Sequence, residues 1–230
     1  MALLFSAAMS ILTWPVATLG AQAEADVRPT LAIMPFTNGA LIAAADYAPL
    51  SKGIAELLLA DLSANEKIRL VERDRLEEIL TEQRVQTAND VDPTTAVRLG
   101  TLLGAQHFLA GGFTIDPKRR VRLDVRSINV ETGRVEYVET VQGKADDILE
   151  LVATLGDKVA RGLSLPPMAA RSADTGHGAK DSFRAALQFG RALAAKDRGD
   201  VSAAIAAAQE ALVSYPDFRR ARALLNELKK

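Results

Sequence analysis

The sequence contains no cysteine among its 230 residues. This absence excludes disulfide bonds, thiolate metal ligands, a cysteine nucleophile and a lipidated N-terminal cysteine. Histidine is almost absent too, since only His107 and His177 occur, and neither has the spacing of a metal site or a nucleophilic triad. We therefore expect no catalytic residue, no metal ion and no cofactor.

The chain also lacks an excess of charge of either sign. Its 28 basic and 29 acidic residues leave a formal net charge of −1, which creates no overall field to attract nucleic acid. One basic turn, Lys118-Arg119-Arg120, leaves peripheral contact with a membrane open, although so few charges usually form a solvated loop. Function is therefore expected to come from local sites.

The first charged residue is Glu24, so residues 1–23 carry no side-chain charge. An apolar stretch from Leu3 to Val16 precedes Ala21-Gln22-Ala23, the pattern of a secretory signal peptide with its cleavage site. No lysine or arginine precedes the apolar stretch, as if the true start codon lay upstream. The alternative is an uncleaved membrane anchor. We favour cleavage and a periplasmic protein, with outer-membrane association left open, and we expect no transmembrane helix after residue 24.

Residues 24–165 alternate between strand and helix patterns. The apolar run 30–36 is typical of a strand that is covered on both faces, and residues 50–62 have the spacing of an amphipathic helix. Further strands are expected at 68–71, 105–115, 121–130 and 134–142, and further helices at 73–84, 93–104 and 146–161. This order predicts an α/β fold, in which a mixed β-sheet is packed with helices as an α/β sandwich.

Residues 166–180 are rich in alanine, serine, glycine and proline and are predicted to form a linker. Residues 181–230 then form a short all-α tail, with helices expected at 181–196, 201–214 and 218–228. The turn at Gly199-Asp200 and the small residues Ala204 and Ala211 resemble one tetratricopeptide (TPR) repeat followed by a capping helix. A lone repeat cannot bury its own faces, so we expect it to pack on the α/β domain, on a second copy or on a partner.

From Leu31 to Gly162, the order of motifs resembles the CsgG-like family, which is named for the curli secretion component. The matching segments are Leu31-Ala32-Ile33-Met34-Pro35-Phe36, Val71-Glu72-Arg73 with Leu76, Ile79, Leu80 and Glu82, Asp92-Pro93 with Ala96, Leu99-Gly100, Leu103-Gly104-Ala105, Gly111, and Glu131-Thr132-Gly133. The family is similar to the penicillin-binding-protein activators and to the N-terminal domain of TolB. The resemblance implies a role in envelope assembly, as a secretion-pore subunit, an activator of wall synthases or an accessory protein of a surface organelle.

The chain departs from the family pattern in two respects. The pore formers and activators look like lipoproteins, whereas no cysteine is present here to be lipidated. The predicted hairpin 121–142 is short and highly charged, so we do not expect it to form part of a membrane pore.

Six residues are candidates for binding a partner: Phe183, Leu187, Phe189, Tyr215, Glu72 and Arg73. The first four concentrate large apolar side chains in the tail, where they could act as contact anchors. The alternative is that they form the core of the tail itself. Glu72 and Arg73 are suggested by the family resemblance, although capping and solvation at the start of a helix explain them more simply.

These observations predict a non-enzymatic envelope protein that acts as a protein–protein adaptor in assembly or secretion. Its expected partners are proteins of the envelope and a second copy of itself. The alternative is an oligomeric ring subunit of an outer-membrane secretion or surface-organelle complex. A hydrolase ranks last, because no pair of carboxylates stands out as a catalytic site.

Overall fold

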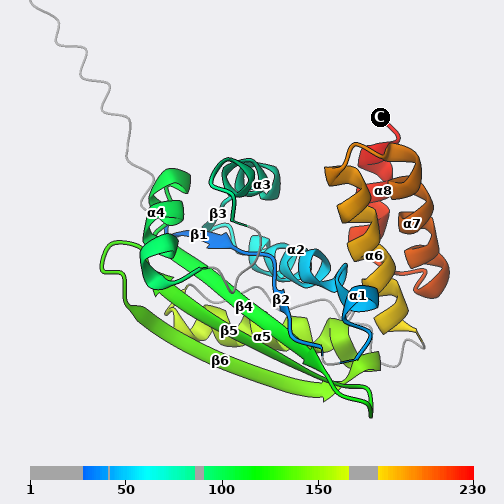
Figure 1. Cartoon of the computed structure of the whole chain (residues 1–230), viewed down its shortest axis with the longest axis horizontal. Coiled ribbons are helices and arrows are strands. Elements are labelled where there is room, and N and C mark those ends of the chain that lie inside the picture. The colour runs from blue at the N-terminus through cyan, green and yellow to red at the C-terminus, as the bar shows by residue number, and fades with distance from the viewer. Residues whose placement is uncertain (1–27, 41, 86–90, 166–180) are drawn as a thin grey trace, which may run out of the picture.

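The computed structural model describes residues 28–40, 42–85, 91–165 and 181–230 (Figure 1). The predicted signal peptide, residues 1–23, and the predicted linker, residues 166–180, lie outside these ranges.

A mixed sheet forms the centre of the molecule, in the order β3-β1-β4-β5-β6, with β2 paired separately to β4. The strands are β1 (Thr30–Ile33), β2 (Thr37–Asn38), β3 (Arg69–Leu70), β4 (His107–Ile115), β5 (Arg120–Asn129) and β6 (Val135–Lys144). β1 runs parallel to both β3 and β4, whereas β4, β5 and β6 form an antiparallel meander. The predicted α/β fold with a mixed sheet is confirmed.

The helices are α1 (Ala44–Tyr47), α2 (Leu50–Ser63), α3 (Arg73–Glu82), α4 (Pro93–Leu103), α5 (Ile148–Gly162), α6 (Ser182–Asp197), α7 (Val201–Ser214) and α8 (Arg219–Leu228), and a 3-10 turn, η2 (Ala145–Asp147), precedes α5. The predicted start of α4 is confirmed, because the Thr95 N–H donates to Asp92 Oδ1 at 2.6 Å and Pro93 occupies the first turn. α4 ends where Gly104 adopts a positive φ of 65°. No helix in the described ranges is long and apolar enough to span a membrane.

Helices cover both faces of the sheet (Figure 1). α2 and α5 pack on one face, here called the α5 face, around buried residues such as Ile33, Leu109 and Leu123. α3 and α4 pack on part of the opposite face, the α4 face, around Phe108 and Ile128. The sheet therefore separates two hydrophobic clusters, as the near-continuous apolar strands predict.

The helical tail packs on the α/β domain through α2. The backbones of α2 and α6 approach so closely that a Cβ atom on Gly190 would lie 2.1 Å from the carbonyl oxygen of Pro49. Phe183, Phe189 and Phe218 belong to the same buried cluster as the α5-face residues of the sheet. Of the three locations predicted for the tail, the structure shows the first.

Candidate interaction site

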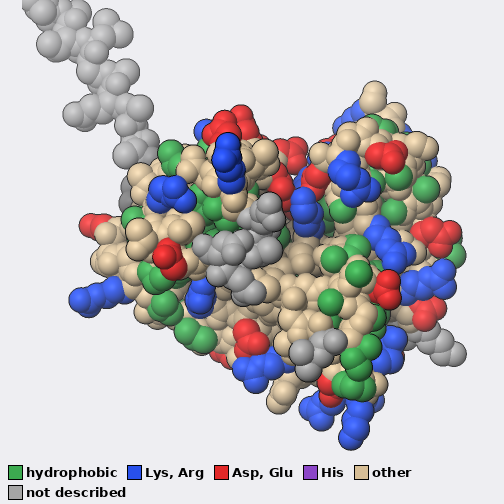
Figure 2. Space-filling model, viewed as in Figure 1, with side chains coloured by type: hydrophobic (Ala, Val, Ile, Leu, Met, Phe, Trp, Pro, Cys, Tyr) green, Lys and Arg blue, Asp and Glu red, His purple; other side chains and the backbone are tan. Residues whose placement is uncertain are grey.

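A charged hollow separates α3 from the helical tail, and Figure 2 shows it as an indentation between these two parts of the surface. We call it the α3–tail cleft. Its lining consists of Glu56 from α2, Arg73 from α3, and Phe189, Leu193, Lys196, Arg220, Ala223, Leu224 and Glu227 from the tail. An apolar pocket beside it, lined by Ile33, Pro35 and Leu59 among others, shares Glu56 and Arg73.

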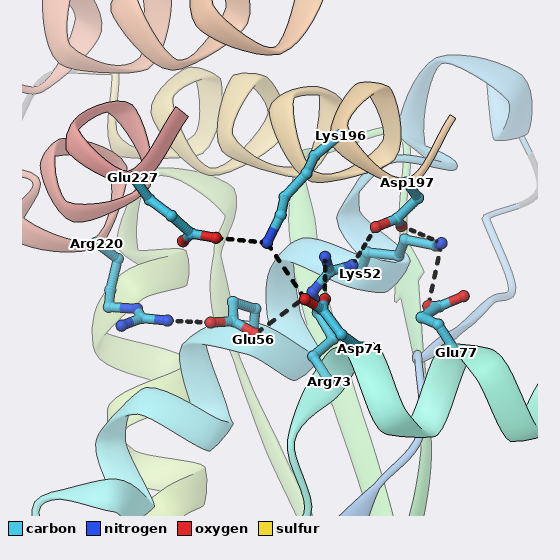
Figure 3. Close-up of polar contacts among 9 residues, drawn as sticks. All are labelled: Lys52, Glu56, Arg73, Asp74, Glu77, Lys196, Asp197, Arg220 and Glu227. Carbon is cyan, nitrogen blue, oxygen red and sulfur yellow. Dashed lines mark hydrogen bonds and ion pairs between the residues drawn. The ribbon is translucent and has the colours of Figure 1, made fainter. Parts of the chain in front are cut away.

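Arg73 lies at the centre of the cleft (Figure 3). Its Nη1 is 2.6 Å from Asp197 Oδ1, its Nη2 is 3.1 Å from Asp74 Oδ1, and its Nε is 4.0 Å from Glu56 Oε2. Burial by itself would lower the pKa of the Arg73 guanidinium, but the hydrogen bond and charge of Asp197, followed by Asp74 and Glu56, raise it overall. Arg73 therefore stays positively charged and links α2, α3 and α6.

Glu56 is the most deeply buried acid of the cleft, with 8% of the residue exposed. Its carboxylate accepts a hydrogen bond from Arg220 on α8, a contact between segments that lie 164 residues apart in sequence. The Nε of Arg220 is buried and has no hydrogen-bond partner within the described ranges. One N–H donor in the wall of the cleft is thus left without an acceptor, which is costly for a buried polar group.

Two lysines bridge the walls of the cleft. The Nζ of Lys52 lies 2.5 Å from Asp197 Oδ2 and 3.1 Å from Glu77 Oε1. The Nζ of Lys196 lies 2.7 Å from Glu227 Oε1 and 3.6 Å from Asp74 Oδ2. Burial by itself would lower the pKa of Lys196, but its interactions with Glu227 and Asp74 raise this pKa overall. The rim is acidic and open, since 70% of the Asp74 side chain and 59% of the Glu227 side chain are exposed.

The predicted contact residues are only partly brought together here. Arg73 and Phe189 line the cleft, and Glu72 is exposed next to Arg73 as the N-cap of α3. Phe189 is nevertheless 1% exposed, because it packs on Phe218 with ring centroids 5.2 Å apart.

The remaining three lie away from the cleft. Phe183 is 6% exposed and makes an edge-on contact with Tyr47 at 5.6 Å. Tyr215 and Leu187 are partly buried against the same core. This burial favours the alternative that the large apolar side chains form the tail's own core, and their role in binding a partner stays a prediction.

Sequence reasoning missed most of the charges in the cleft. Glu56, Lys196, Asp197 and Arg220 come from α2 and from the tail, and each looks like an ordinary solvated residue of an amphipathic helix. The one available signal is the pair Glu72-Arg73, which capping and solvation at the start of a helix explain more simply than partner contact. No local pattern could have shown that Arg73 faces Asp197, which lies 124 residues further along the chain.

His107 is also paired with an acid, but it belongs to no metal-binding group among the residues that the structure describes. Its Nδ1 hydrogen-bonds to Glu136, which accepts a further hydrogen bond from Ser127 at 2.8 Å. No group of three or more histidine, aspartate or glutamate side chains in the described ranges could hold a metal ion. His177 lies outside those ranges.

Several solved structures are similar in fold to part of this chain. The C-terminal domain of LpoB from Salmonella enterica is 16% identical with a TM-score of 0.39, and the match covers 50% of this chain and 82% of that one. The lipoprotein GNA1162 from Neisseria meningitidis is 15% identical with a TM-score of 0.43, covering 59% and 96%. TolB from Acinetobacter baumannii is 13% identical with a TM-score of 0.42, covering 60% of this chain but only 28% of that protein.

No curated protein matches the sequence at a significant level. The profile of one family does match: residues 16–115 fit the family described as curli production assembly/transport component CsgG. The order of motifs predicted this similarity, which the profile shows for residues 16–115.

Proposed function

We propose that this chain is a non-enzymatic protein of the cell envelope, located in the periplasm, which binds another protein as an adaptor in assembly or secretion. Its similarity to the CsgG family, described as an assembly/transport component, supports a role of this class. Residues 1–23, with the features of a signal peptide, support export.

The observation that carries this proposal is the construction of the α3–tail cleft. Buried and half-buried charges are stabilising only where they are paired, and here two chain segments distant in sequence supply them to each other. The rim carboxylates of Asp74 and Glu227 share the ammonium group of Lys196, and Asp74 also pairs with Arg73. A partner segment that presents a basic side chain to this rim would add a cation beside these two exposed carboxylates.

The expected occupant is thus a basic segment of an envelope protein, held at the rim by Asp74 and Glu227. The double variant Asp74→Lys, Glu227→Lys reverses both rim charges. It removes the contact of Asp74 with Arg73 but leaves the Glu56 and Asp197 contacts of Arg73 in place. A photo-crosslinking amino acid at the exposed position Glu72 would report the occupant in intact cells.

The expected result is one discrete crosslinked species that depends on the position of the probe and disappears in the double charge-reversal variant. A probe at Val213, which is 76% exposed on α7, provides the matched control. The proposal fails if the crosslinked species persists after charge reversal, or if Glu72 and Val213 give the same species.

The alternative function is a subunit of an oligomeric ring. A ring requires a head-to-tail interface that closes after several copies. Light scattering on residues 24–230, with and without mild detergent, separates the two functions: a discrete large assembly supports the ring, and a monomer or dimer supports the adaptor.

A further inference from the structure

The strand β6 ends the sheet and leaves a long edge without a partner. It has 10 residues, and no strand lies beyond it in the described part of the chain (Figure 1). The opposite edge strand, β3, has only 2 residues. An open edge of this length presents unpaired N–H and C=O groups, to which another strand can add.

The hydrogen bonds identify which backbone groups point outward. The Ala145 N–H donates to the Arg119 carbonyl at 2.8 Å, so position 145 faces β5. From Val138 to Lys144 the register with β5 is regular, and alternate residues of a strand point to opposite sides. The N–H and C=O groups of Val138, Thr140, Gln142 and Lys144 therefore face the open edge.

A hydrogen bond and an exposed side chain along β6 also indicate that this edge is open. The Thr140 N–H does not reach β5 and donates instead to Glu139 Oε1 at 3.0 Å, as expected of an outward-facing group. Val138 is 65% exposed, one of the most exposed large apolar residues in the described ranges. An apolar side chain on an open edge favours coverage by a neighbouring strand.

We propose that β6 pairs with β6 of a second copy of this chain, in antiparallel orientation about a twofold axis at Val141. This register is favoured because it pairs all four outward-facing residues with one another, Val138 with Lys144 and Thr140 with Gln142. It places no two like charges opposite each other. It also sets Glu139 against Gly143, which has no side chain to obstruct the carboxylate.

Pairing also supplies new contacts for groups that are exposed in the monomer. The aliphatic stem of Lys144 from the second copy covers Val138. The Thr140 N–H exchanges the Glu139 carboxylate for a main-chain carbonyl, and Glu139 keeps its bonds from Lys158 and Tyr137. The dimer is expected to be weak. A single pair of strands buries less area than a standard interface of about 1,200–2,000 Å2, so the fraction of dimer depends on protein concentration. The β6 edge and the α3–tail cleft involve different residues, so the dimer does not require the cleft to bind a partner.

The test begins with the mass of residues 24–230, which include every described residue, measured by light scattering over a range of concentrations. Thr140→Pro removes an outward-facing N–H and leaves the main-chain hydrogen bonds to β5 intact. It also removes the side-chain bond from Thr140 Oγ1 to Asp124 on β5, so the second variant, Val138→Lys, provides an independent test. Val138→Lys places two lysines opposite each other at each end of the pairing. We expect each variant to raise the dimer dissociation constant at least about tenfold, whereas Val213→Lys on α7 leaves it unchanged. Circular dichroism checks that the variants are folded.

Because the chain contains no cysteine, the register can be tested with pairs of introduced cysteines. In a mixture of Thr140→Cys and Gln142→Cys proteins, mild oxidation should give a mixed disulfide, because directly opposite residues have a Cα separation that a disulfide can bridge. A mixture of Thr140→Cys and Val213→Cys should not give this product. A monomer at every concentration, a dimer unaffected by both β6 variants, or equal crosslinking in the two mixtures would overturn the proposal.

Discussion

At the scale of single residues, the Glu139 carboxylate on β6 accepts three hydrogen bonds. Its carboxylate accepts bonds from Lys158 Nζ at 3.0 Å, Tyr137 Oη at 2.8 Å and the Thr140 N–H at 3.0 Å. These bonds, that of Lys158 first, lower the pKa of Glu139 to about 2. Burial, followed by the bond to Glu139, raises the pKa of Tyr137 to about 12. The contacts fix β6 to α5.

This lowered pKa predicts a specific dependence of stability on pH. A carboxylate whose pKa is lower in the folded state stabilises the fold above its unfolded value, here 4.5, and the contribution is lost as pH falls toward about 2. The free energy of unfolding should therefore fall less steeply in Glu139→Gln than in the wild type between these values. Denaturant titrations at a series of pH values measure this difference. Parallel curves for the two proteins below pH 4.5 would contradict it.

The close approach of Gly190 to Pro49 predicts that even one methyl group disrupts the contact between α6 and α2. A Cβ at position 190 would lie 2.1 Å from the Pro49 oxygen and 2.6 Å from its carbonyl carbon, so the backbone itself would have to move. Gly190→Ala should lower the free energy of unfolding by about 1–3 kcal/mol despite the better helix propensity of alanine. Gln209→Ala, at an exposed position of α7, is the control. A stabilised Gly190→Ala variant would show that the two backbones are further apart.

At the scale of whole elements, the helix ends and strand ends follow local chemistry closely. Pro35 ends the predicted strand 30–36, because proline cannot donate to the ladder, so β1 stops at Ile33 and pairing with β4 resumes at Thr37. The short helix α1 was not predicted. It has no buried residue and therefore no apolar periodicity to reveal it.

The cap of α4 gives a prediction at this scale. Asp92 Oδ1 accepts the Thr95 N–H at 2.6 Å, and this bond is the first cause of the lowered pKa of Asp92. Asp92→Ala should lower the free energy of unfolding, as is typical of a lost N-cap. Asp147 is also an N-cap residue, but it makes no side-chain cap bond, so Asp147→Ala is a matched control. Equal losses in the two variants would mean that the cap bond itself contributes nothing.

At the scale of the whole molecule, the α/β domain and the helical tail share one hydrophobic cluster. Leu50, Ile54 and Leu58 of α2 are fully buried, and the cluster that contains them includes Phe189 and Phe218 of the tail. The tail is therefore a structural part of the protein that packs on the α/β domain.

This shared core predicts that the tail is needed for stability. Residues 24–165 alone would expose the α2 side chains that α6 covers, at a cost of about 25 cal/mol for each Å2 of apolar surface returned to water. This fragment should bind a hydrophobic dye and unfold at a lower denaturant concentration, whereas residues 24–230 should unfold in a single transition. Two separate transitions in residues 24–230 would show that the tail folds independently.

Most of the fold can be predicted from the sequence, because each helix or strand is determined largely by residues that are close together in the chain. Period-two and period-3.6 patterns, the Asp92-Pro93 start of α4 and the glycine after its end each reflect interactions within a few residues. The ordered motifs between Leu31 and Gly162 also indicated the resemblance to the CsgG family, whose profile matches residues 16–115. Signal peptide and linker boundaries rest on the sequence alone.

Only the tertiary structure decided where the tail packs and which charges meet. Arg73 and Asp197, or Glu56 and Arg220, are brought together by helix packing across more than a hundred residues, and neither partner carries a local sign of the other. The aromatic residues of the tail illustrate the same point, because a phenylalanine that anchors a partner and one that fills a core look alike in sequence. Neighbouring residues determine local hydrogen bonding and periodicity, whereas contacts between distant segments depend on how the completed elements pack.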